Sequence, residues 1–311
     1  MRFVKSHAAG NDFVLLPDLE DRIELTPGLV RALCAPHTGL GADGVIRVAP
    51  PSQVHEGDLF MDYWNADGSV AEMCGNGIRC VAKYASDHGA VQGDEVNVGT
   101  RAGVKRAQIT ERSHDGRVTA AAVDMGAPRL TGQRQVDVSP GRLRVPPMPG
   151  HRMVTLERVV VMVTTVSMGN PHAVLLVDDV ETAPVAAWGP TIECDESFPQ
   201  GTNVEFIAVP ARDRVVGRVW ERGVGETLAS GTGASAMAVA AHALGLADRR
   251  VRVELPGGIL DIDWTSGSVW VTGPAVEVAN GELDPAWLDA IVGEKTLCGD
   301  GTSEPNGGGR R

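Results

Sequence analysis

Two short segments place a reactive side chain directly before a glycine cluster and the start of an alanine-rich stretch. Cys74 precedes Gly-Asn-Gly, and Ser230 precedes Gly-Thr-Gly. The stretches that follow, residues 77–85 and 233–246, have the composition of helices. A helix N-terminus presents unpaired N–H groups and a partial positive charge, so it binds anions and lowers the pKa of a thiol. We therefore expect the thiol of Cys74 to ionise readily.

A carboxylate held between the two helix starts would accept hydrogen bonds from main-chain N–H groups, namely those of Gly75, Asn76, Gly231 and Thr232. The α-carbon of that substrate would then lie between residues 74 and 230. One group on each face can remove a proton from one side and return a proton to the other, which inverts the centre. The fixed N–H dipoles would stabilise the charge that develops on the carboxylate.

Either glycine cluster taken alone would carry little weight. A lone cluster before a helix is usually structural punctuation, and a lone buried cysteine usually packs as a small hydrophobic residue. Repetition of the element in both halves of the chain argues against both interpretations. A phosphate-binding P-loop is not supported, because neither cluster ends in Gly-Lys-Ser or Gly-Lys-Thr.

The whole chain carries an internal repeat. The segment GNDFVLL from Gly10 matches GNPHAVL from Gly169 at an offset of 159 residues. The segment from Asp62 to Gly77 (DYWN to MCGNG) matches the segment from Arg218 to Gly233 (RVWE to ASGTG) at an offset of 156. Two segments with nearly one offset predict two homologous halves, each a β-rich lobe wrapped on a helix, which meet at a pseudo-twofold cleft.

Short runs rich in Val and Ile and bounded by Gly, Pro, Asp or Asn predict strands at residues 12–16, 95–98, 118–123, 159–166, 173–177, 204–209, 251–255 and 269–271. The expected class is therefore α/β (α+β). We expect an N-terminal lobe over residues 1–135 with a returning segment at about 275–295, and a C-terminal lobe over 136–274. The chain is expected to cross from one lobe to the other within the Pro-rich and Arg-rich stretch 129–149. A disordered tail is expected over residues 296–311.

Composition excludes several classes of protein. The 311 residues are 43% hydrophobic, which permits a sizeable core, and the net charge of −12 argues against a nucleic-acid partner. The opening apolar run is too short and interrupted for a signal peptide or a membrane span. Histidines and cysteines are scattered rather than set at metal-ligand spacings, and five irregularly spaced cysteines argue against a disulfide framework. A cytoplasmic location fits these features. Four cysteines are expected to be catalytically inert, namely Cys34, Cys80, Cys194 and Cys298.

Blocks of sequence along nearly the whole chain, up to about residue 288, resemble the diaminopimelate epimerase family. These are HAAGNDFVLLPD, GLGADGV, FMDYWNADGSVAEMCGNGIRC, MGNPHAV, FPQGTNVEF, ERGVGETLASGTGASA, and PGG with TGPAVEV. The resemblance implies a pair of pseudo-symmetric lobes, each a β-barrel-like sheet around a central helix, with the active site in the cleft between the lobes. It also implies chemistry that needs no cofactor, neither pyridoxal phosphate nor a metal.

The same resemblance assigns roles to single residues. It places Cys74 and Ser230 at the two acid/base positions, with His172 and Glu221 helping to move protons. It assigns the main-chain donors of Gly75, Asn76, Gly231 and Thr232 to the reacting carboxylate. The distal end of the substrate is implied to contact Asn11, Asn65, Asn170, Asn203 and Arg222. Taken singly, an Asn beside Gly is usually a turn residue and His172 a core histidine, but together these residues favour the functional interpretation.

Ser230 departs from the family pattern, which has cysteine before Gly-Thr-Gly. An alcohol is far too weak an acid to serve as an effective base without a strong neighbouring activator. Three possibilities stay open: an engineered substitution, a natural enzyme with one-thiol chemistry such as elimination or one-sided exchange, and an inactive homologue that only binds. Ala8, Ala9 and Trp64 also depart from the pattern, beside positions expected to contact the substrate.

The leading hypothesis is an isomerase that interconverts LL- and meso-diaminopimelate by two-base proton transfer, in lysine and peptidoglycan precursor biosynthesis, impaired by Ser230. A small-molecule amino acid is the expected partner, and a homodimer is a candidate assembly. The alternatives are a related amino-acid racemase or dehydratase with another substrate, and a non-catalytic amino-acid-binding protein on the same scaffold.

Overall fold

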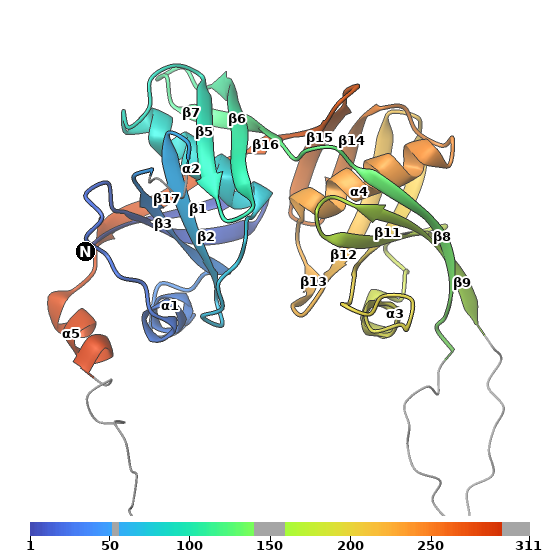
Figure 1. Ribbon diagram of the computed structural model, residues 1–311, viewed down its shortest axis with the longest axis horizontal. Coiled ribbons are helices and arrows are strands. Elements are labelled where there is room, and N and C mark those ends of the chain that lie inside the picture. Colours follow the sequence, from blue (N-terminus) through green and yellow to red (C-terminus); the bar gives the residue numbers. More distant parts are fainter. Residues whose placement is uncertain (52–55, 140–158, 294–311) are drawn as a thin grey trace, which may run out of the picture.

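The structure is a computed structural model that describes residues 1–51, 56–139 and 159–293. Figure 1 shows two lobes, one in blue and cyan around α2 and one in yellow and orange around α4. Their strands belong to one continuous 17-stranded sheet. No helix in the described ranges is long and apolar enough to cross a membrane. The expected disordered tail, residues 296–311, lies outside the described residues, as does much of the predicted crossing stretch 129–149.

The first lobe is a sheet of consecutive, mostly antiparallel strands with two helices inserted. The elements are β1 (Arg2–Ala8), β2 (Asn11–Pro17), α1 (Pro27–Cys34), β3 (Gly44–Ala49), β4 (Leu59–Asn65), α2 (Gly75–Asp87), β5 (Glu95–Thr100), β6 (Gly103–Arg112) and β7 (Val118–Asp124). The two pairs joined through a helix, β2 with β3 and β4 with β5, are parallel. The others along this ladder are antiparallel.

The second lobe repeats this order. Its elements are β9 (Val160–Ser167), β10 (Pro171–Leu176), α3 (Val185–Glu193), β11 (Asn203–Ala211), β12 (Arg214–Glu221), the short β13 (Gly225–Thr227), α4 (Gly231–Ala243), β14 (Arg250–Leu255), β15 (Gly258–Trp264) and β16 (Val269–Pro274). The pairs joined through α3 and α4, β10 with β11 and β12 with β14, are again parallel. The predicted repeat and the two-lobed α/β class are therefore confirmed.

Each lobe curls its sheet around one helix. The helix α2 contacts β1, β2, β4, β5, β6 and β7, and it is buried from Gly75 to Ala85. Glycine at its third residue favours close packing, since a Cβ on Gly77 would lie 2.8 Å from Cδ1 of Ile46 and 3.0 Å from Cε of Met61, and the ends of these side chains would have to shift. The helix α4 contacts β9 to β12 and β14 to β16, and its small residues permit the same close approach.

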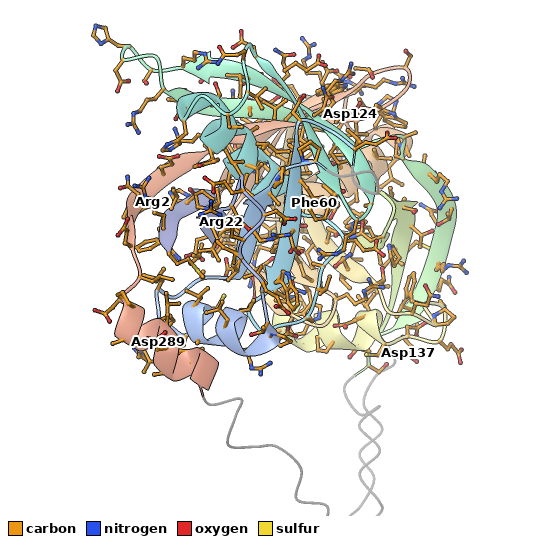
Figure 2. All side chains as sticks on the ribbon, turned by 60° about the vertical axis from the view of Figure 1, so that its left-hand side comes forward. Arg2, Arg22, Phe60, Asp124, Asp137 and Asp289 are labelled. Atoms are coloured by element: carbon orange, nitrogen blue, oxygen red, sulfur yellow. The ribbon has the colours of Figure 1, made fainter. Side chains whose placement is uncertain are left out.

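The two halves exchange their last strands. After β7, the strand β8 (Arg129–Asp137) pairs with β9 of the second lobe, and after β16, the strand β17 (Val276–Glu282) pairs with β1 of the first. Between the crossings, β7 and β16 pair with each other and join the lobes into one sheet. Asp124, which ends β7 at this junction, is labelled in Figure 2 and accepts a hydrogen bond from the hydroxyl of Ser268. The lobe limits of 1–135 and 136–274 stay a prediction.

The segment expected to return at 275–295 contains β17 and a last helix, α5 (Pro285–Gly293). This helix lies against α1 at the lower edge of the first lobe (Figure 1). Leu283 and Trp287 join the apolar cluster that α1 forms with β2 and β3. The end of the described chain therefore packs on the N-terminal half of the sequence.

Candidate active site

The N-termini of α2 and α4 face each other between the lobes. Cys74 is the N-cap residue of α2 and Ser230 is the N-cap residue of α4. A Cβ built on Gly231 would lie 3.7 Å from Cα of Gly75, so the first turns of the two helices are in close approach. The structure thus brings together the acid/base positions and the main-chain N–H groups expected to hold a carboxylate.

Cys74 lies deep in this junction, although part of its surface stays accessible. Its thiol donates a hydrogen bond to Oδ1 of Asn11 at 3.6 Å. Burial raises the pKa of the Cys74 thiol to about 11, against the opposing effect of the main-chain N–H groups of Gly77 and Asn76. The expectation of a readily ionised Cys74 is therefore wrong for the thiol in this setting. Desolvation outweighs the helix N-terminus, and the charge of Glu221 adds to it.

Ser230 is 5% exposed and acts as a capping residue. Its Oγ accepts a hydrogen bond from the N–H of Gly233 at 3.2 Å and lies 3.4 Å from Oγ1 of Thr232. The carboxylate of Glu221 is hydrogen-bonded by Ser230 and, at 2.6 Å, by the hydroxyl of Thr227. Burial raises the pKa of Glu221, and these two hydrogen bonds oppose the rise. Glu221 therefore stands next to position 230, as a proton-transfer partner requires.

His172 forms a fully buried pair that includes a residue which the sequence did not single out. Its Nδ1 lies 2.6 Å from Oε1 of Glu205, and its Nε2 lies 2.9 Å from Oδ1 of Asn170. Both side chains of the His172–Glu205 pair are 0% exposed. Burial raises the pKa of Glu205, and the interaction with His172 opposes the rise. A Cβ on Gly233 would lie 3.2 Å from both Oε1 of Glu205 and Oγ of Ser230, which places the pair directly behind Ser230.

Two of the asparagines expected in the site lie in the first lobe, and one of them contacts the thiol of Cys74. The side chain of Asn11 accepts a hydrogen bond from the thiol of Cys74 and donates one to the carboxylate of Asp43 at 2.8 Å. Asn11 was expected at the distal end of the substrate, and it also contacts the thiol. Asn65 lies beside Gly44 in the β3–β4 pair and donates to Ser69 at 3.0 Å. Asn11 begins β2 and Asn65 ends β4, the two strands that flank β3 in the first lobe.

In the second lobe, Asn203 connects the remaining residues. Its side chain donates to the carbonyl of Pro171 and accepts from the main-chain N–H of Arg222, each at 3.0 Å. The exposed guanidinium of Arg222 donates to the carbonyl of Gln200 at 3.0 Å. Asn203 therefore joins the strand that carries His172 to the turn that carries Arg222.

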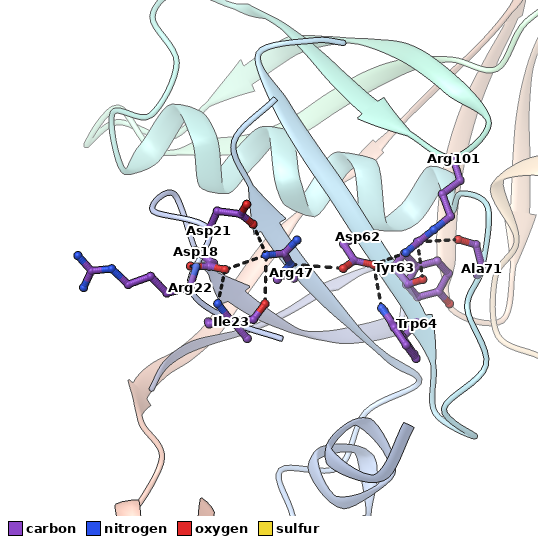
Figure 3. A network of polar contacts seen from close by, with 10 residues as sticks. All are labelled: Asp18, Asp21, Arg22, Ile23, Arg47, Asp62, Tyr63, Trp64, Ala71 and Arg101. Carbon is purple, nitrogen blue, oxygen red and sulfur yellow. Dashed lines mark hydrogen bonds and ion pairs between the residues drawn. The ribbon is translucent and has the colours of Figure 1, made fainter. Parts of the chain in front are cut away.

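A buried ionic network supports the segment between Asn65 and Cys74. Arg47 donates hydrogen bonds to Asp18 and Asp62, and these contacts can be followed in Figure 3. Asp62 also accepts a hydrogen bond from Arg101 at 2.6 Å. Arg101 also donates to the carbonyls of Tyr63, within β4, and of Ala71, whose N–H donates to the carbonyl of Tyr63 across the turn that follows β4. The network thereby fixes the turn that leads into α2.

The indole of Trp64 donates to Asp62 at 2.8 Å, and its ring packs on the apolar cluster of α1. Its orientation is therefore set by the first lobe's own core. No group of three or more His, Cys, Asp or Glu side chains in the described part of the chain is arranged to hold a metal ion.

Comparison with known proteins agrees with this architecture. A family model described as diaminopimelate epimerase matches residues 3–131 and 164–282. The diaminopimelate epimerase of Acidovorax ebreus is 46% identical over 292 residues, which cover 91% of this chain and 98% of that protein. The diaminopimelate epimerase of Pelotomaculum thermopropionicum is 43% identical over 286 residues, with the same coverage of both chains.

Solved structures show the same fold at low sequence identity. A probable proline racemase from Agrobacterium radiobacter superposes with a TM-score of 0.65 at 16% identity, over 91% of this chain and 93% of that one. A predicted epimerase from Pseudomonas aeruginosa gives a TM-score of 0.60 at 18% identity, over 91% and 98%. With relatives above 40% identity along nine tenths of its length and a matching family model, this chain belongs to the diaminopimelate epimerase family.

Proposed function

We propose that this chain is a diaminopimelate epimerase, an isomerase that interconverts LL- and meso-diaminopimelate for lysine and peptidoglycan precursor synthesis without a cofactor. The observation that carries the proposal is the facing pair of helix N-termini, with Cys74 on one and Ser230 on the other. Relatives named as diaminopimelate epimerases support the choice of substrate. The cytoplasm is the expected location, and a homodimer stays part of the proposal.

In the proposed reaction, the reacting carboxylate lies between the two helix N-termini and accepts hydrogen bonds from the main-chain N–H groups of both. The α-carbon then lies between Sγ of Cys74 and Oγ of Ser230. A base on one face takes the α-proton while an acid on the other face delivers a proton, so the substrate keeps its composition and changes its configuration. The two sets of main-chain N–H groups stabilise the negative charge that builds on the carboxylate in between.

The distal amino-acid group would be held by Asn65, Asn170, Asn203 and Arg222. Arg222 is suited to a second carboxylate, because its exposed guanidinium presents a planar set of donors. Asn203 already fixes the main chain of Arg222 and would set the position of that guanidinium. A substrate with two amino-acid ends fits such an arrangement better than a simple amino acid.

Ser230 makes the proposed enzyme a one-thiol enzyme. The serine hydroxyl is engaged as the cap of α4, and the adjacent Glu221 carboxyl holds its proton more strongly than an exposed glutamate does. Serine at position 230 leaves in place the thiol of Cys74 and the main-chain N–H groups at the two helix N-termini. We therefore expect binding to persist, inversion to be slow, and exchange with solvent to take place on the face of Cys74.

Solvent-deuterium incorporation tests the proposal. Each diaminopimelate stereoisomer is incubated with the chain in deuterated buffer, and both label and configuration are followed. Label gained with retention in one stereoisomer supports one-sided exchange by Cys74. Absence of binding to every stereoisomer would contradict diaminopimelate as the substrate.

A second candidate function is an amino-acid-binding protein without turnover. The capping hydrogen bond from Gly233 to Ser230 favours it, because a hydroxyl used as a cap is a good structural residue in its own right. Binding without any label in any stereoisomer, in the chain and in Ser230→Cys alike, would support this candidate.

A further inference from the structure

The central helix of the first lobe carries a fully buried arginine. Arg79 is 0% exposed and projects from α2 toward β16. A Cβ on Gly273 of β16 would lie 3.3 Å from both Cζ and Nε of Arg79, so a glycine in the strand leaves room for the guanidinium. The group is enclosed and does not reach solvent.

The charge of Arg79 is poorly compensated. Within residues 1–51, 56–139 and 159–293, no ion pair to a carboxylate is found and Nη1 has no hydrogen-bond partner. Burial lowers the pKa of Arg79, and the groups that oppose this are the thiols of Cys80 and Cys74. Lys83, on the same helix, is also buried but contacts Asp87 at 2.7 Å and the carbonyl of Val118 at 2.6 Å. A buried cation without a carboxylate is unfavourable for folding, which indicates a role other than packing.

Arg79 donates one hydrogen bond from Nε to the carbonyl of Pro274 in β16, at 3.4 Å, and a second one toward the active site. Its Nη2 donates to Oδ1 of Asn76 at 2.6 Å. Nδ2 of Asn76 then donates to Oδ1 of Asn11 at 3.2 Å, the same atom that accepts from the thiol of Cys74. Nδ2 of Asn76 also lies 3.3 Å from the carbonyl of Ala229, directly before Ser230. Asn76 thus connects the two acid/base positions, and Arg79 fixes which end of its amide faces them.

This charge is present in one half of the repeat. Arg79 follows Cys74 by five residues, and the residue five positions after Ser230 is Ser235. The hydroxyl of Ser235 donates to the carbonyl of Gly231 at 2.8 Å, within its own helix. The half with the thiol therefore has a cation beneath its helix start, and the half with the hydroxyl has a neutral side chain.

We propose that Arg79 is a positioning residue for Cys74, which orients the Asn76 amide between the two lobes and supplies the positive charge that balances an anion at the site. It acts through Asn76 and does not touch the substrate. The anion is the Cys74 thiolate, to which Arg79 is connected through Asn76 and Asn11. The inference rests on the proposed function for the role of Cys74, but its test needs no diaminopimelate.

The test is the pH dependence of Cys74 alkylation by iodoacetamide in the full chain, followed by mass spectrometry of the Cys74 peptide. Arg79→Met removes the charge, Arg79→Lys keeps it, and Lys83→Met is the matched control because it removes a buried cation that contacts a carboxylate instead. Circular dichroism checks that each variant folds. We expect Arg79→Met to slow alkylation by ~10-fold or more between pH 8 and 9, since one pKa unit is a factor of ten in thiolate. Arg79→Lys should retain most of the rate, and Lys83→Met should retain all of it.

An unchanged profile in Arg79→Met would overturn the proposal, and so would an equal loss in Lys83→Met. Should Arg79→Met fail to fold, Asn76→Ala carries the test, because it removes the amide and keeps the main-chain N–H. Slower alkylation in Asn76→Ala supports the proposal, and an unchanged rate overturns it. Failure to bind diaminopimelate would count against the proposed function and leave these rates as they are.

Discussion

Replacing Ser230 by cysteine should convert a poor epimerase into an efficient one. Burial raises the pKa of Cys74 to about 11, so roughly one thiol in a thousand is ionised at pH 8. A thiol at position 230 would have a similar setting, because the site is 5% exposed and Glu221 lies against it. An alcohol is a far weaker acid than a thiol, so the alkoxide of Ser230 is present at that pH in a much smaller fraction than a thiolate would be.

This difference in available base sets the direction of the expected change. A positioned group accelerates a reaction by about 100- to 10,000-fold, and we expect Ser230→Cys to gain a factor in that range. The gain should come in kcat, since the N–H groups and Arg222 that bind the substrate are unchanged. The same variant should lose about 0.5–2 kcal/mol of stability, because sulfur is a poorer acceptor for the capping N–H of Gly233.

The assay is chiral chromatography of LL- and meso-diaminopimelate over time, with solvent deuterium to follow each face. Ser230→Ala is the control, because it removes the hydroxyl without adding a base. It should invert as slowly as the unaltered chain and lose a similar amount of stability. If the chain with Ser230 inverts diaminopimelate as fast as the Ser230→Cys variant, efficient inversion does not need a thiol at both acid/base positions, and the reasoning is wrong. Glu221, which is hydrogen-bonded to Ser230, would then be the first candidate for the second base.

Three further predictions follow from packing and ionisation. Alkylation of Cys74 should accelerate about tenfold for each pH unit between 7 and 10, since its pKa of about 11 lies above that range; a plateau by pH 8, measured on the Cys74 peptide, would contradict the desolvated thiol. Asp18→Asn should cost about 1–3 kcal/mol at pH 7, measured by urea denaturation, because a nearly buried carboxylate loses its bond to Arg47. Burial alone would raise the pKa of Asp18, but hydrogen bonds hold it below 3.8; they come from the main-chain N–H groups of Arg22 and Ile23 and from Arg47. The contribution of Asp18 to the free energy of unfolding is therefore present above pH 3.8 and is lost as the pH falls through the lowered pKa of the folded state. Gly44→Ala should cost about 1–3 kcal/mol, because its Cβ would lie 2.6 Å from the carbonyl oxygen of Trp64, whereas Gly267→Ala, which meets open space, should stay within about 0.5 kcal/mol.

Local pattern was sufficient to predict both central helices and about half of the strands that carry the repeat. Both central helices and all eight predicted strands are present in the structure, because each combines β-branched or alanine-rich composition with glycine or proline boundaries. The other nine strands were missed, namely β1, β3, β4, β6, β8, β12, β13, β15 and β17. Most residues of β8 are exposed and polar and show no apolar alternation. The pairing of β8 with β9 and of β17 with β1 is also beyond local pattern, because sheet order is set by contacts between distant segments.

Within the site, residue types were predicted better than their environment. The sequence placed Cys74 and Ser230 at helix starts, but it gave no measure of burial, so the direction of the Cys74 pKa was wrong. Glu205 was missed because a single charge within a strand is normally an exposed position, and only the fold places it against His172. Arg79 was missed for the same reason, since an arginine in a helix is usually solvated. Glu205 lies directly between apolar residues in β11, which is the signal that could have identified it.

The crossing of β8 and β17 bears on how such a chain could have arisen. A half-length ancestor with this topology would have left the edge of its first strand open and its last strand without a partner, so it would have been stable as a pair of copies that traded those strands. Fusion of two such copies would turn that exchange into a covalent connection. A pair of identical copies must carry the same residue at both helix starts, whereas the two halves of one chain can differ. Cys74 opposite Ser230, and Arg79 opposite Ser235, are combinations that a pair of identical copies could not carry.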